Sequence, residues 1–112
     1  MSMLKITARD AATGPVLEVS GDLDYRNATQ LRERATATVL RPGQRLILDL
    51  SGLEFCDSSG ISALIAAHHH ATTLGANVAL AAVPAPTLRI LRLIGLDTII
   101  PLHPDSDPAT LA

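Results

Sequence analysis

The sequence has very few aromatic residues: one tyrosine, one phenylalanine and no tryptophan among 112 residues. Proteins that bind single-stranded nucleic acid stack bases on aromatic side chains, so this mode of binding is disfavoured. The sequence also has no run of basic residues, and its formal net charge is -2. Attraction to a phosphate backbone is therefore weak, and we expect no nucleic acid among the partners.

Cysteines and secretion signals are equally scarce. Cys56 is the single cysteine, which excludes an internal disulfide and is typical of a reducing compartment. We interpret it as a small buried hydrophobic residue rather than a nucleophile. The N-terminus has no apolar region followed by a small-residue cleavage site, so we expect a cytoplasmic protein. Residues 58–88 have no charged side chain, but histidines, threonines and prolines interrupt them, which indicates packed elements without membrane insertion.

Motifs that would indicate an enzyme are missing as well. The sequence has no GxSxG elbow, no GxxxxGKS or GxxxxGKT phosphate loop and no HExxH zinc motif. His68, His69 and His70 are consecutive, and consecutive side chains on a helix point about 100° apart, so they do not converge on a metal. We expect His68 to be partly buried and the other two to face outward. We therefore predict a protein that is no enzyme and binds neither a metal nor a cofactor.

What the sequence does contain is an alternation of strand and helix patterns. Polar and apolar residues alternate on both sides of a turn near the N-terminus, which predicts an antiparallel hairpin. The prediction is a single α/β domain over residues 1–112 with a mixed four- to five-stranded sheet, an opening antiparallel hairpin and about three to four helices. Its core spans about residues 4–102, and residues 103–112 form a loosely held tail. Strands are expected at residues 4–9, 16–20, 45–50, 77–83 and 97–100, and helices at 28–40, 58–74 and 84–95.

The segment LEFCDSSGISALI at residues 53–65 places two serines and a glycine between an acidic residue and an apolar run. A loop over residues 51–57 is expected to lead to Asp57 as a helix N-cap. Its carboxylate would accept hydrogen bonds from backbone NH groups that have no partner within the helix. Ser58 and Ser59 would then occupy the first turn, and helix capping alone is one sufficient reason for both of them.

Capping does not explain Gly60, because glycine inside a helix costs about 1 kcal/mol relative to alanine. A missing side chain next to a hydroxyl would let the backbone of another protein come close. The motif is therefore also a candidate contact site.

Three blocks occur in order along the chain: GDLD at residues 21–24, LILDLSGLEFCDSSGISALI at residues 46–65 and PTLRILRLIGLDTII at residues 86–100. Together they resemble the STAS domain of bacterial anti-sigma factor antagonists. The block that contains DSSG is the most specific of the three.

The resemblance implies a protein that switches between partners. In such antagonists the unphosphorylated form binds an anti-sigma factor that is also a serine kinase, and the sigma factor is released. The kinase phosphorylates the second serine of the motif, here Ser59, and a serine phosphatase reverses the modification. Asp24 matches the aspartate of the family's loop beside that serine. The partner-binding residues implied are Asp22, Asp24, Asp57, Ser58, Ser59 and Gly60.

Two alternatives stay open. Ser58 is a competing phosphate acceptor, although a structural role in the first helical turn is the expectation for it. The second alternative is a STAS adaptor subunit of a membrane ABC transporter of the lipid type, in which the serine need not be phosphorylated. A homodimer is compatible with either function.

Overall fold

The computed structural model describes residues 3–106, which form one five-stranded mixed sheet with helices packed against it. The strands are β1 (Lys5–Ala11), β2 (Gly14–Leu23), β3 (Arg45–Cys56), β4 (Asn77–Ala81) and β5 (Leu102–His103). Their order in space is their order in the sequence. β1 and β2 form an antiparallel hairpin, and each later strand is parallel to the one before it. The predicted α/β class, with its mixed sheet and opening hairpin, is confirmed.

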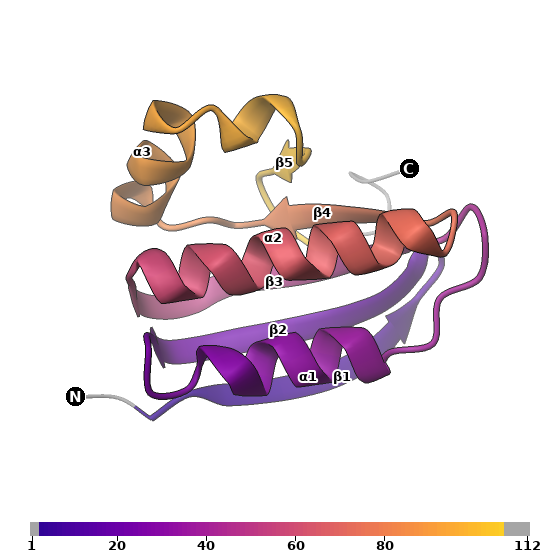
Figure 1. Cartoon of the computed structure of the whole chain (residues 1–112), viewed down its shortest axis with the longest axis horizontal. Helices are drawn as coiled ribbons and strands as arrows, with labels where there is room; N and C mark the ends of the chain where they lie inside the picture. Colours follow the sequence, from indigo (N-terminus) through magenta and orange to yellow (C-terminus); the bar gives the residue numbers. More distant parts are fainter. Residues whose placement is uncertain (1–2, 107–112) are drawn as a thin grey trace.

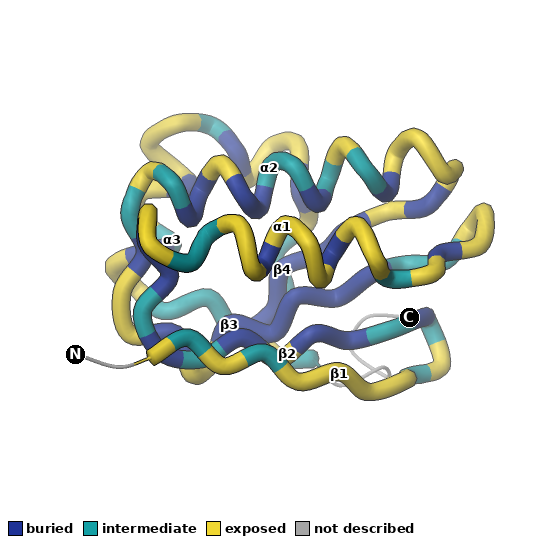
Figure 2. The backbone as a smooth tube through the Cα atoms, turned by 60° about the horizontal axis from the view of Figure 1, so that its bottom comes forward, coloured by how far each residue is buried: buried dark blue, intermediate teal, exposed yellow. Residues whose placement is uncertain are grey.

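Helices connect the parallel strands, since such strands need a long crossover connection. α1 (Ala28–Ala37) and α2 (Ser58–Thr73) lie side by side on one face of the sheet (Figure 1). α3 (Ala85–Leu93) and the short 3-10 helix η1 (Leu96–Thr98) lead from β4 to β5. Buried positions of α1 and α2 are turned toward the sheet (Figure 2). Within residues 3–106, no helix is long and apolar enough to span a membrane.

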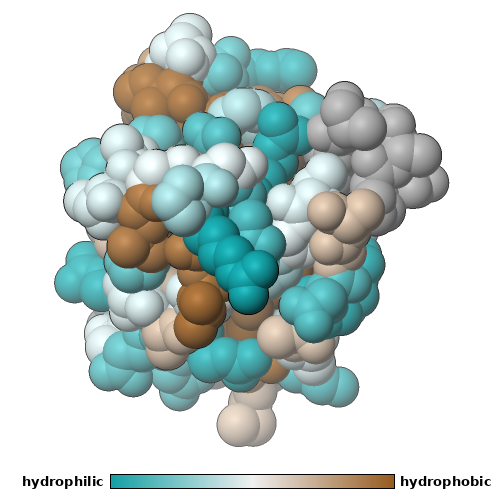
Figure 3. All heavy atoms as spheres, turned by 90° about the vertical axis from the view of Figure 1, so that its right-hand side faces the viewer, coloured by the Kyte–Doolittle hydropathy of each residue, from teal (hydrophilic) through white to brown (hydrophobic). Residues whose placement is uncertain are grey.

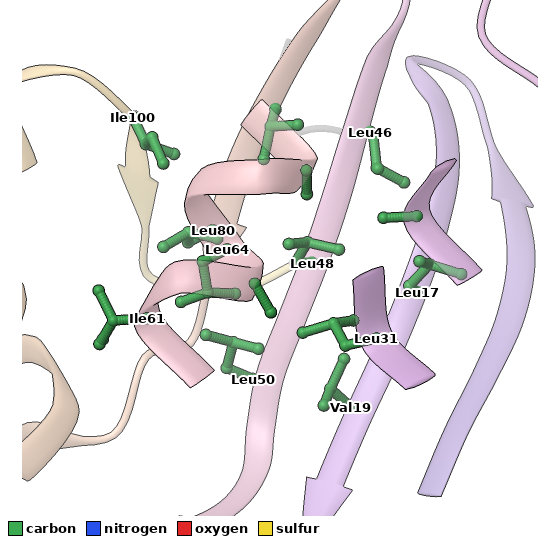
Figure 4. Close-up of a cluster of buried hydrophobic side chains, with 14 of the residues drawn as sticks. Leu17, Val19, Leu31, Leu46, Leu48, Leu50, Ile61, Leu64, Leu80 and Ile100 are labelled. Carbon is green, nitrogen blue, oxygen red and sulfur yellow. The ribbon is translucent and has the colours of Figure 1, made fainter. Parts of the chain in front are cut away.

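The main core is aliphatic and lies between the sheet and the two helices α1 and α2 (Figure 4). Because side chains alternate between the faces of a strand, every second residue of β2 and β3 points toward the helices. Burying one leucine or valine contributes about 1.5–3 kcal/mol. The residues of this layer that are almost completely buried include Leu17, Val19, Leu31, Leu46, Leu48, Leu50, Leu64 and Leu80.

The other face of the sheet carries a smaller cluster and a polar contact. The cluster consists of Val16, Ile47 and Ala81. The hydroxyl of Ser106 donates to Asp49 Oδ2 at 2.8 Å and accepts from Arg9 Nη2 at 2.9 Å. The segment expected to be a loosely held tail, residues 103–112, thus begins with His103 of β5 and includes Ser106, which makes this contact. Its last part, residues 107–112, lies outside the described residues.

β3 is longer than predicted. The sequence predicted a loop over residues 51–57, whereas β3 runs on to Cys56. Continued pairing with β2 is the reason, because Ser20 lies opposite Gly52 and Leu23 lies opposite Cys56. A Cβ at Gly52 would lie 2.7 Å from the Ser20 Cβ, so the absence of a side chain lets the strands approach. Long-range pairing therefore makes a strand of a segment whose local sequence looks like a loop.

The last strand is not where the sequence predicted it. Residues 97–100 were expected to form it, but Gly95 ends α3 with a φ of +77° and η1 follows. The backbone NH groups of Ile99 and Ile100 both donate to the Leu96 carbonyl oxygen, at 3.0 and 2.9 Å. The strand forms instead at β5. The remaining elements are confirmed, with ends that differ from the predictions by a few residues.

Candidate functional site

The predicted site residues meet where β2 and β3 end and α1 and α2 begin (Figure 1). Since β2 and β3 are parallel, their carboxyl ends lie at the same edge of the sheet. The backbone NH of Asp57 donates to the Leu23 carbonyl oxygen at 3.2 Å, directly beside the last paired residues of the two strands. The structure thereby brings Asp22 and Asp24 together with residues 57–60.

Asp57 connects α2 to the loop that precedes α1. It is the N-cap of α2, and its Oδ1 accepts a hydrogen bond from the backbone NH of Gly60 at 3.0 Å. Its Oδ2 accepts another from the backbone NH of Tyr25 at 3.2 Å. The predicted capping role is confirmed, and a cap of this kind contributes about 0.5–2 kcal/mol. The second hydrogen bond means that one carboxylate also holds the loop after β2 in place.

Asp24 is buried, and its carboxylate is bound within its own loop. It accepts hydrogen bonds from the Arg26 backbone NH at 2.9 Å and from Arg26 Nη2 at 2.6 Å. Hydrogen bonding to Arg26 lowers the pKa of Asp24 below its usual value, although burial opposes this. Asn27 completes the loop, because its Oδ1 accepts from the Asp24 NH and its Nδ2 donates to the Asp22 carbonyl oxygen. Asp24 therefore shapes the loop beside α2.

Arg26 and Asn27 were not among the predicted site residues. Asp and Asn side chains often bond to backbone groups two or three residues away in turns, and this spacing is the signal that could have identified both. Asp22 lies at the end of β2 opposite Phe55 and is half-buried. The hydrogen bond to Asp24 is the main reason that the pKa of Arg26 is raised, and the negative charges of Asp24 and Asp22 add to the effect.

The two serines of the motif have different surroundings. Ser58 is exposed, and its carbonyl oxygen accepts a hydrogen bond from the Ser62 hydroxyl at 3.0 Å. Ser59 is half-buried and lines a hollow of about 250 Å³ between α1 and α2. Thr29 and Arg32 line the same hollow from α1. Ser59 as the phosphate acceptor stays a prediction, and a phosphate there would be attached beside α1.

Gly60 has an internal role that the sequence did not suggest. It is buried, and a Cβ at this position would lie 2.7 Å from Cys56 Sγ and 2.9 Å from Leu23 Cγ. The first turn of α2 can therefore pack on the ends of β2 and β3 only without a side chain at this residue.

Burial, together with the charge of Asp57, raises the pKa of the Cys56 thiol to about 11. The thiol is consequently neutral near pH 7, as expected for a packing residue.

Both aromatic residues of the chain lie exposed at the end that carries the site. Tyr25 directly follows Asp24 and is 77% exposed, and Phe55 near the end of β3 is 51% exposed. At the opposite end, the described part of the surface mixes hydrophilic and hydrophobic residues in small separate patches (Figure 3). Exposed aromatic side chains are enriched at protein interfaces. Composition alone could not reveal that these two residues flank the predicted site.

The histidine run does not assemble a metal site in the part of the chain that the structure describes. Within residues 3–106, no three His, Cys, Asp or Glu side chains come together as metal ligands. His68 is half-buried as predicted and His69 is exposed, whereas His70 is also half-buried rather than facing fully outward.

Comparisons with known proteins show which proteins this chain is similar to. A curated relative, the anti-sigma F factor antagonist of Paenibacillus polymyxa, is 27% identical over 89 residues, which are 79% of this chain and 76% of the relative. The crystal structure of an anti-sigma factor antagonist from Mycobacterium paratuberculosis superposes with a TM-score of 0.83 at 28% identity. That similarity covers 98% of this chain and 96% of the other.

Two further comparisons concern the fold and the family. The structure of the Bacillus cell fate determinant SpoIIAA in its phosphorylated form has a TM-score of 0.67 at 16% identity. It covers 88% of this chain and 90% of that one, and at this identity the likeness shows the shared fold. A family model described as "Mlab, STAS domain" matches residues 6–102. The chain therefore belongs to the STAS domain family.

Proposed function

We propose that this protein is an anti-sigma factor antagonist controlled by phosphorylation of Ser59. In its unphosphorylated form it binds an anti-sigma factor with serine kinase activity, and a serine phosphatase restores this form after phosphorylation. It acts in the cytoplasm as a binding protein rather than as an enzyme. The observation that carries the proposal is the place of Ser59, which lies in the first turn of α2 beside the exposed Tyr25. The named relatives from Paenibacillus and Mycobacterium support it.

Phosphorylation at this position would alter binding more than folding. A phosphate adds about 1.5 to 2 negative charges at neutral pH. The positive end of the helix dipole favours an exposed negative charge in the first turn by about 0.3–1 kcal/mol, so the fold tolerates the group. A partner surface that complements a neutral hydroxyl near Asp22 and Asp57 would have to desolvate the new charge. Phosphorylation therefore lowers the affinity for the partner more than it lowers the stability of the fold.

The kinase is first identified by a pull-down from extract of the source organism, with wild-type protein and the Ser59→Asp variant as parallel baits. Binding of the purified partner is then measured by calorimetry. We expect Ser59→Asp to weaken binding at least tenfold, which corresponds to about 1.4 kcal/mol. Ser59→Ala should bind like wild type. Ser58→Asp is the matched control, because it adds the same charge one residue earlier, and it should change the affinity much less.

Equal affinity of wild type and Ser59→Asp for the kinase would contradict the proposal. A larger loss for Ser58→Asp than for Ser59→Asp would move the acceptor to Ser58. Thermal unfolding of all three variants checks that the fold is kept.

A second candidate is an adaptor subunit of a lipid-type membrane ABC transporter. The observation in its favour is an apolar surface on and after α3, where Leu93 is 79% exposed and Ile94 is 57% exposed. Permanent assemblies use interfaces that are more hydrophobic than those of transient complexes. If wild type and Ser59→Asp retain the same transporter ATPase equally well, this second function is supported and the phosphorylation switch is not.

A further inference from the structure

The hollow between α1 and α2 has a polar lining that faces Ser59. Thr29 and Arg32 are three residues apart on α1 and therefore share one face of that helix, and Ser59 and Ser62 do the same on α2. All four residues line the hollow, which measures about 250 Å³, and Tyr25, which precedes α1, lines it as well. The hydroxyl groups of Thr29 and Ser62 and the guanidinium group of Arg32 thus line the same hollow as the Ser59 side chain.

Arg32 is the cation of this hollow. Within residues 3–106, its guanidinium group has no carboxylate in ion-pair contact. The neighbouring arginines are engaged elsewhere, since Arg26 binds Asp24 and Arg34 donates to the Ile6 carbonyl oxygen at 3.3 Å. Asp57, the N-cap of α2, has both carboxylate oxygens occupied by the backbone NH groups of Gly60 and Tyr25.

We propose that Arg32 is the internal ligand of the phosphate group when Ser59 is phosphorylated, with the Thr29 hydroxyl as a second donor. Arginine pairs with phosphate through two parallel charge-assisted hydrogen bonds, and its planar fork suits this geometry better than lysine does. The inference rests on the proposed modification of Ser59. It adds that the phosphate group is held against α1 inside the hollow and does not extend freely into solvent.

The pairing predicts a measurable change in the ionisation of the phosphate. The second ionisation of phosphoserine has a pKa near 6, and a neighbouring cation favours the doubly charged form. The full chain is prepared with phosphoserine incorporated at position 59 during synthesis, and the phosphorus NMR signal is titrated from pH 4 to pH 8. We expect the phosphate pKa to be about 0.5 to 1 unit lower in the wild-type background than in Arg32→Gln.

Arg34→Gln is the matched control. It removes one positive charge from the same helix, but Arg34 donates toward β1 and does not line the hollow. Its phosphate pKa should equal that of the wild-type background. Asp22, Asp57, Tyr25 and Arg26 also lie near the site, and they are unchanged in both variants, so their influence on the titration is common to all samples.

An unchanged phosphate pKa in Arg32→Gln would overturn the inference, as would an equal shift in Arg34→Gln. The titration needs neither the kinase nor the partner, so its outcome is separate from that of the binding test. If Ser59→Asp binds the partner like wild type while Arg32→Gln shifts the phosphate pKa, the proposed switch fails and the internal pairing stands. If binding changes and the titration does not, the switch stands without Arg32.

Discussion

Replacing Gly60 with alanine separates an internal role of this residue from a role in partner contact. In an exposed helix, the change from glycine to alanine stabilises by about 1 kcal/mol. Here the new Cβ would lie 2.7 Å from Cys56 Sγ, 2.9 Å from Leu23 Cγ and 3.0 Å from the Leu23 carbonyl oxygen. That carbonyl also accepts the Asp57 NH, so it cannot move away without loss of a hydrogen bond.

Forcing a methyl group into a packed site costs about 1–3 kcal/mol. Subtracting the helix gain of about 1 kcal/mol leaves a net destabilisation of about 0–2 kcal/mol for Gly60→Ala, with a midpoint of about 1 kcal/mol. The free energy of unfolding is measured by urea titration followed by circular dichroism. Ser62→Ala is the control, because it lies at an exposed position of the same helix, and its stability should stay within about 0.5 kcal/mol of wild type.

A double variant tests which atom causes the destabilisation. Cys56→Ala removes the sulfur nearest to the new methyl group, so Cys56→Ala with Gly60→Ala should be more stable than the sum of the single changes predicts, by about 0.5 kcal/mol or more. The packing argument is refuted if Gly60→Ala is about 1 kcal/mol more stable than wild type. If Gly60→Ala were more stable and also bound the partner more weakly, the role of Gly60 would be to let the backbone of the partner come close.

Two other predictions concern carboxylates. Asp57→Ala should lower the free energy of unfolding by about 1–2 kcal/mol, because it removes the α2 cap and the contact with the Tyr25 NH. Asp57→Asn should keep most of the wild-type unfolding free energy. An unchanged urea midpoint for Asp57→Ala would contradict the capping role. For Asp49, burial raises the pKa, but hydrogen bonds from Ser51 and Ser106 outweigh it and hold the pKa below its usual value. Its ionised form therefore stabilises the fold above the unfolded-state pKa of about 3.9, and this contribution is lost as the pH falls through the lower folded-state pKa. The unfolding free energy of wild type should exceed that of Asp49→Asn at pH 7, and the difference should shrink in acid. A difference that grows toward pH 3 would refute the stabilising role of the ionised Asp49.

The sequence by itself determined the secondary structure elements that depend on local pattern. Alternating residues indicate the hairpin of β1 and β2, and apolar runs indicate the buried strands β3 and β4. Asp57 could be recognised as a cap because capping depends on one side chain and the next three residues. The order of GDLD, DSSG and the third block was sufficient to indicate the family, which the match over residues 6–102 shows.

Only the tertiary structure decided the features that depend on residues far apart in the sequence. Residues 51–56 form a strand because β2 supplies a parallel partner, and the strand after η1 forms at Leu102 because β4 offers a free edge there. The need for a glycine at position 60 comes from Leu23 and Cys56, which reach it from two different strands. Ser59 and Arg32 line one hollow because α1 and α2 cover the same face of the sheet, and helix packing of this kind leaves no signal in the residues nearby in sequence.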